Sequence, residues 1–136
     1  MVKGRDDARL ALIARLVEVN DLVERNVAGS LNSNVYFLQG LVDGGASEQS
    51  EDQITSDVWL QEEEIRADTE EWLFGFMLLA YDPLSDADIE AYIRYSATPA
   101  GQALNTALFD GFDAMYRAIS HDLGVLVGEA SKSSEL

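Results

Sequence analysis

Residues 98–127 read TPAGQALNTALFDGFDAMYRAISHDLGVLV. Thr98 is a favourable helix N-cap, and Pro99 suits the first helical position because its missing N–H needs no partner there. Large apolar side chains then recur every three or four residues, at Leu104, Leu108, Phe112, Met115, Ile119, Leu123 and Leu126. That spacing places them along one face of a helix. The stretch therefore predicts a helix over residues 99–127 and an all-α fold around it.

The chain before this helix divides into four further helical segments. We expect them at residues 7–28, 31–42, 54–81 and 86–95. Gly29 and Gly44 end the first two segments, because glycine is common just beyond the last turn of a helix. Pro83 ends the third, since the residue before a proline avoids the helical backbone conformation. Ser85 and Asp88 form a capping box that begins the fourth, with Asp in the place of the usual Glu.

Helical spacing also predicts which side chains are buried. In the 54–81 segment one apolar stripe contains Ile54, Val58, Ile65, Trp72, Phe76 and Leu79. In the 86–95 segment the inward residues are Ile89, Tyr92 and Ile93. We expect both stripes to face the core, because an amphipathic helix of a globular protein turns its apolar face inward.

Length and composition predict one domain over residues 1–136. The chain has 136 residues, of which 47% are hydrophobic, enough for a core without covalent staples. Short connections between amphipathic helices favour an antiparallel bundle or an orthogonal array of about five helices. No apolar run approaches the roughly 18–20 residues that span a bilayer, so we expect no membrane insertion.

The net charge of −16 limits the choice of partners. Nucleic-acid binding is not expected, because phosphates are contacted largely by Lys and Arg. Residues 46–71 hold ten acidic residues and one basic residue, which is more than half of the net charge. We interpret residues 44–53 as a mobile acidic loop and the following acids as a solvated helix face. The alternative is a docking face for a basic protein partner or for divalent cations.

No constellation of residues predicts catalysis. Cysteine is absent, and His121 is the single histidine. Asp113, Arg117 and Asp122 are near it in sequence, so a His–carboxylate pair for acid–base chemistry is conceivable. Ser120 cannot complete a triad, because adjacent helix residues point to different faces. We therefore expect a histidine near a helix end, no catalytic residue, no metal ligand and no cofactor.

The aromatic side chains exceed what one core stripe needs. Phe74, Tyr95 and Phe109 lie off the apolar stripes and could line an apolar groove or a dimer contact, and burial on both flanks of a central helix is the alternative. Gly75 and Gly111 lie within predicted helices, where glycine costs about 1 kcal/mol relative to alanine. Close approach of another helix, in the same chain or in a second copy, would explain both glycines.

One turn resembles a known family. Tyr95-Ser96 is followed by Pro99 and Gly101, between two predicted helices. This pattern resembles the bacterial family called domain of unknown function 2059, over about residues 82–126. The resemblance implies an exported, periplasmic helical protein without an assigned activity. The polar start of the chain shows no signal peptide, so a cytoplasmic location applies if the chain is full length.

These observations favour a non-enzymatic interaction module of the bacterial cell envelope, with a homodimer as one form. The second hypothesis is a small-molecule binder with an apolar groove between the predicted third, fourth and fifth helices, bordered by Trp72, Tyr95 and Phe109. A hydrolase is a distant third.

Overall fold

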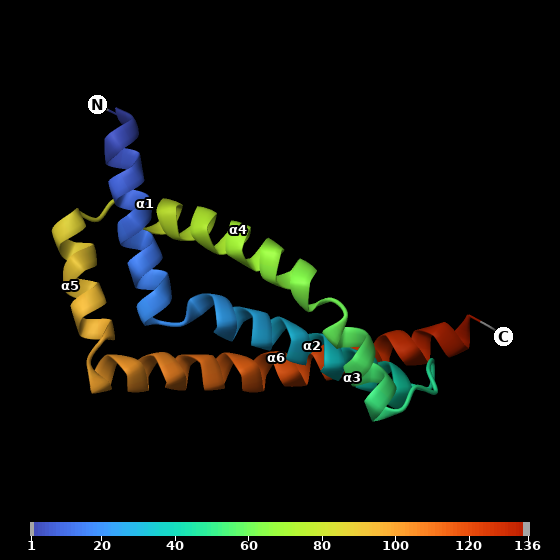
Figure 1. The fold of residues 1–136 in the computed structure, drawn as a ribbon. Helices are drawn as coiled ribbons and strands as arrows, with labels where there is room; N and C mark the ends of the chain where they lie inside the picture. The colour runs from blue at the N-terminus through green and yellow to red at the C-terminus, as the bar shows by residue number, and fades with distance from the viewer. Residues whose placement is uncertain (1, 135–136) are drawn as a thin grey trace. The chain divides into compact units, whose positions relative to one another are not determined.

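The computed structural model describes residues 2–134, with side chains from residue 7 onward. They form six helices and no strand. These are α1 (Val2–Val19), α2 (Leu22–Asp43), α3 (Glu51–Trp59), α4 (Glu62–Tyr81), α5 (Asp86–Ser96) and α6 (Pro99–Ser133) (Figure 1). The all-α prediction is confirmed, with six helices in place of about five. The finer choice between a bundle and an orthogonal array stays a prediction.

The first predicted break, at residues 29–30, was wrong, because the chain turns at residues 20–21 instead. Helix α2 runs through Gly29, whereas the chain turns at Asn20 and Asp21. Asp21 has a φ of 52°, a left-handed conformation that Asp tolerates better than most residues. The turn is supported from a distant segment: Gln102 donates to the carbonyl of Val19, and Asn105 donates to that of Asn20. These tertiary bonds satisfy carbonyls that a helix end would otherwise leave without partners.

The predicted helix over residues 54–81 is two helices. It begins earlier, because Ser50 caps α3 in a capping box with Gln53, so the connecting loop is shorter than the predicted 44–53. It is then interrupted after Trp59, where Leu60 and Gln61 form a turn before α4. The side chain of Gln61 accepts a hydrogen bond from Asn34 of α2. This contact with a residue far away in sequence accompanies the break.

Helices α5 and α6 begin at the predicted residues, Asp86 and Pro99, and α5 ends at Ser96, one residue later than predicted. Ser85 caps α5 in the expected box with Asp88. Pro99 is the first residue of α6, and the Thr98 hydroxyl accepts from the amide of Gly101. The predicted end at residue 127 was too early, since α6 continues to Ser133.

The described parts of the chain fall into two compact units. The first combines Met1–Asn26 with Arg66–Phe109, and the second combines Val27–Ile65 with Asp110–Leu136. Each unit therefore joins segments from distant parts of the sequence, and the division falls inside α2, inside α4 after its first turn and inside α6.

The first unit has the larger apolar core. Helix α1 lies beside α5, as Figure 1 shows in blue and yellow, and side chains of α4 complete the cluster. Ile13, Leu16 and Ile89 are fully buried there. The remaining buried members of this core are Leu12, Val17, Leu73, Met77 and Ile93.

On α4 the inward face differs from the predicted one. Leu73 and Met77 are buried, whereas Trp72, Phe76 and Leu79 are exposed. Tyr92 of α5 is also more exposed than expected, at 41%. Both sets have helical spacing, so periodicity alone could not decide which face of α4 meets the core.

The second unit is built around a close helix pair. The second half of α6 runs along α2, with backbone atoms nearly in contact (Figure 1). A Cβ added to Gly124 would lie 2.9 Å from the Cα of Gly40, and one added to Gly128 would lie 3.0 Å from the Cα of Gly44. The buried apolar residues of this unit include Val27 and Leu31 of α2 and Ile54 and Val58 of α3.

Candidate functional site

One face of α6 in the second unit is committed to α2. Its positions are Asp113, Arg117, His121, Gly124 and Gly128, spaced by four, four, three and four residues. A helix turns by 100° per residue, so these positions share one face. Residues of α6 that lie about half a turn from these positions must therefore point away from α2.

The opposite face carries the predicted apolar stripe. We call Met115, Ile119, Leu123 and Leu126 the α6 stripe. Their exposed fractions range from 44% for Met115 to 62% for Leu126. Tyr116 and Val127 flank the stripe and are also exposed. The predicted apolar residues therefore lie along one face of α6, and this face is exposed in the part of the chain that the structure describes.

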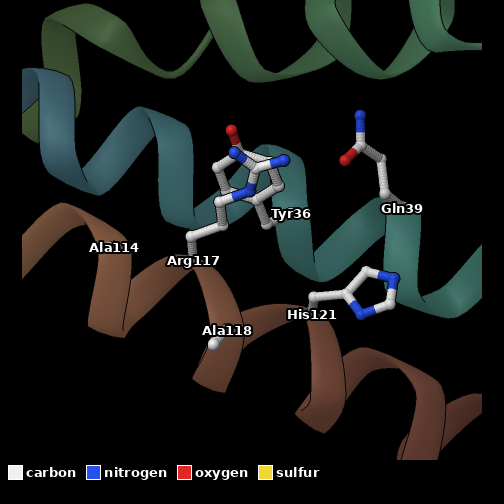
Figure 2. A pocket seen from close by; sticks show the side chains of 6 residues that line it. All are labelled: Tyr36, Gln39, Ala114, Arg117, Ala118 and His121. Carbon is white, nitrogen blue, oxygen red and sulfur yellow. The ribbon is translucent and has the colours of Figure 1, made fainter.

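The α6 stripe carries no charge. The acidic residues Asp122 and Glu129 border it on one side, because they follow Met115 at seven-residue intervals. Arg117 and His121 point to α2, as Figure 2 shows. The stripe is therefore an apolar surface without charged side chains of its own.

The seam between α2 and α6 forms a hollow of about 360 Å³ (Figure 2). It is lined by Tyr36, Gln39, Ala114, Arg117, Ala118 and His121. The small side chains of Ala114 and Ala118 leave the space, and Arg117 covers the ring of Tyr36 at 4.7 Å from its centroid. The guanidinium of Arg117 and the ring of Tyr36 are therefore engaged with each other in a cation–π contact.

His121 is held by two carboxylates. Its Nε2 lies 2.7 Å from Oδ2 of Asp43, and its Nδ1 lies 3.6 Å from Oδ1 of Asp122. The hydrogen bond to Asp43 raises the pKa of His121 above its usual 6.5, and Asp122 adds to that rise. An imidazolium paired in this way ties α6 to the last residue of α2. Both ring nitrogens therefore face carboxylates, and the bond to Asp43 connects α6 with α2 as a polar latch.

The first unit has a hollow of its own, of about 390 Å³. Its floor is apolar, with Ala14, Val17 and Phe74, and its rim holds Glu18, Asp21, Glu24 and Glu70. Arg66 pairs with Glu24 through its two terminal guanidinium nitrogens, Nη1 and Nη2. Among residues 7–134 no three His, Cys, Asp or Glu side chains come together to hold a metal ion.

The predicted groove residues make separate contacts. Trp72 stacks on Phe76 of the same helix, with ring centroids 5.5 Å apart. The guanidinium carbon of Arg25 lies over the Phe109 ring, 5.5 Å from the centroid of that ring. Tyr95 is 44% exposed. Neither hollow described above is lined by these three aromatic residues, and a groove between them stays a prediction.

The two mid-helix glycines do not mark close approach within the chain. Apart from the adjoining residues and backbone of its own helix, a Cβ at Gly75 or at Gly111 would meet no atom of the described residues within 4 Å. The glycines that do allow close approach are Gly40 and Gly124, together with the pair Gly44 and Gly128. The sequence carried a signal for these glycines that the helical stripes did not reveal. On each helix the two glycines are four residues apart, at 40 and 44 on α2 and at 124 and 128 on α6.

The turn that carries the family resemblance has a structural explanation. Ser96 is buried and accepts a hydrogen bond from Asn20, 3.2 Å away. A Cβ on Gly101 would clash with the carbonyl oxygen of Tyr95, so glycine is required there. Pro99 begins α6 directly after this contact. Gly101 therefore packs the start of α6 against the end of α5, and Ser96 joins α5 to the turn that follows α1.

No helix of the described residues has both the length and the apolarity needed to cross a bilayer. Comparisons with protein-family models, with curated proteins and with solved structures found no match to this chain. The resemblance to domain of unknown function 2059 therefore stays a prediction that depends on the turn alone.

Proposed function

We propose that this protein is a non-enzymatic interaction module that docks a protein partner on the α6 stripe. The observation that carries the proposal is the exposure of four consecutive stripe residues, each close to half accessible or more. Contiguous apolar faces of this kind on a folded protein mark interaction sites, because leaving them in water forgoes the free energy of burial.

The seam between α2 and α6 supports the same proposal. Glycine contacts on one face of α6 fix its backbone against α2, and the Asp43–His121 pair ties the helices at the end of α2. The stripe is therefore presented on a helix that is already ordered. A preorganised surface loses less conformational entropy on binding, which favours recognition.

The remaining parts of the proposal come from the sequence. The acidic residues 46–71 would add attraction for a basic region of a partner. A location in the bacterial cell envelope follows only from the resemblance of the 95–101 turn. For a small-molecule site, in contrast, three lining groups of the α2–α6 hollow are already engaged: Arg117 with Tyr36, and His121 with Asp43.

Site-specific photo-crosslinking tests the proposal. A photoreactive amino acid at Ile119 reports on the stripe, and the same group at Asp52, exposed on α3, is the matched control. In the cells that make the protein, irradiation should give adducts at position 119 and far fewer at position 52. Equal labelling at both positions, or uncrosslinked monomer alone at position 119, would show that the stripe is not a contact surface.

A further inference from the structure

We infer that the partner on the α6 stripe is a second copy of this chain, with the two α6 helices paired about a two-fold axis. The inference rests on the proposed function and names its partner. It is argued from the area of the stripe and from the distribution of charge.

The stripe is large enough for the centre of a dimer interface. Its four residues and the flanking Tyr116 and Val127 are each 41–62% exposed. Large side chains have areas on the order of 150–250 Å², so this patch presents roughly 500 Å². A stable interface takes about 800 Å² from each partner, and the remainder is expected from the polar rim. A two-fold pair uses the same patch twice, so one stripe supplies both halves of the contact.

The charge of the chain favours pairing at this place. Two copies with a net charge of −16 each repel one another wherever their acidic surfaces meet. The uncharged stripe is a surface where such copies can touch without placing carboxylates in the interface centre. A basic partner would instead be drawn to residues 46–71, where ten acidic residues gather. Self-association is thus the use that fits an apolar stripe on a strongly acidic chain.

The spacing of the stripe fits packing between two long helices. Ile119 and Leu126 are seven residues apart, and Met115 precedes Ile119 by four. Steps of three and four residues are those of paired helices whose side chains interlock. The part of α6 in the second unit, residues 110–133, is about 36 Å long at 1.5 Å per residue, enough for several turns of contact.

Sedimentation equilibrium of the purified full chain tests the inference. We expect twice the chain mass for the wild type, and an Ile119→Lys variant should weaken the dimer by about 100-fold, because a charge then enters the interface centre. Thr55→Lys is the matched control, since it adds the same charge at an exposed position of α3 and should leave the mass unchanged. Circular dichroism checks that both variants keep their helix content.

Salt gives an independent readout. Raising the NaCl concentration from about 50 mM to about 500 mM should tighten the dimer, because screening reduces the repulsion between like-charged copies. Binding of a basic partner would weaken under the same change. A dimer that weakens with salt would overturn the inference.

A short bis-maleimide crosslinker gives the geometry. The chain has no cysteine, so Ile119→Cys and Thr55→Cys each carry one reactive thiol. Position 119 should yield a crosslinked dimer and position 55 should not, since only the former lies near the proposed axis. Equal yields at both positions would overturn the pairing.

The outcomes separate this inference from the proposed function. A monomeric purified chain whose Ile119 crosslinks to a different protein in cells would refute self-pairing and leave the interaction module standing. A monomeric Ile119→Cys variant whose thiol resists labelling would show that the chain covers its own stripe, which refutes both.

Discussion

The two helix pairs of this protein are held together in opposite ways. In the first unit, α1 and α5 meet through large apolar side chains, with Ile13 and Ile89 fully buried between them. The ion pair of Arg15 with Glu90 borders that contact. In the second unit, α2 and α6 meet through glycines, so backbone lies against backbone. The first contact depends on large buried side chains, and the second depends on the absence of side chains at the glycines.

This difference determines where the apolar face of α6 can point. A helix whose glycines and polar residues face its neighbour has its large apolar residues left for the other side. On α6 the seam uses Gly124 and Gly128, and the stripe residues Ile119 and Leu126 point away. Opposite substitutions should break the two seams: removal of atoms in the first and addition of atoms in the second.

The largest effect is expected from Ile89→Ala. It removes fully buried side-chain atoms and leaves a cavity, which should lower the free energy of unfolding by roughly 2–5 kcal/mol. Urea unfolding measures the loss, and hydrogen exchange should rise first in α1 and α5. Leu104→Ala is the control, because that side chain is half exposed and should cost at most about 1 kcal/mol. Similar costs for the two variants would mean that the first core is not organised around Ile89.

A smaller loss is expected from Gly124→Ala. The added Cβ would clash with the carbonyl oxygen of Phe37 and lie 2.9 Å from the Cα of Gly40. Backbone atoms cannot rotate away as a side chain can, so the helices must separate, at a cost of about 1–3 kcal/mol. Faster hydrogen exchange in α2 and in the second half of α6 would report the opening.

Gly75→Ala is the matched control for that variant. Nothing in the described chain lies within 4 Å of the new Cβ, so the better helix propensity of alanine should raise stability by up to about 1 kcal/mol. If Gly124→Ala also stabilised the protein, the close contact of α2 and α6 would be refuted.

The smallest effect concerns the polar latch of the second seam. The pKa of His121 is raised by its hydrogen bond to Asp43, so the folded state favours the protonated ring. Its stabilising contribution is complete below the unfolded pKa of about 6.5 and is lost as the pH rises through the higher folded pKa. An NMR titration follows it directly, because the chain has one histidine.

The partner variant sharpens that measurement. Asp43→Asn should bring the pKa of His121 down towards its usual value, and Asp122→Asn should lower it less, since Nδ1 is 3.6 Å from that carboxylate. A His121 pKa that does not respond to Asp43→Asn would argue against the latch between α2 and α6.

Local signals in the sequence predicted several elements correctly. The capping box at Ser85 and Asp88, and proline at the start of α6, act through neighbouring backbone groups, so they can be recognised without any tertiary information. The break at Asn20 could not be recognised in this way. It is completed by Gln102 and Asn105, which are more than 80 residues away.

The choice between two apolar faces was also beyond the sequence. On α4, Leu73 and Met77 are buried and Trp72 and Phe76 are exposed, although both pairs have helical spacing. On α6, the stripe was identified residue by residue, but its spacing did not show that this face is exposed. Periodicity shows that a face is apolar, but only a neighbouring helix determines whether that face is covered.

The sequence by itself determined that this chain is helical, acidic and without cysteine, and where its cap-and-proline signals begin α5 and α6. These properties depend on composition and on interactions between residues a few positions apart. Only the tertiary structure decided that Gly40 meets Gly124, that Asp43 holds His121, and that the α6 stripe points away from α2. Those outcomes depend on contacts between segments some 80 residues apart, which no local pattern specifies.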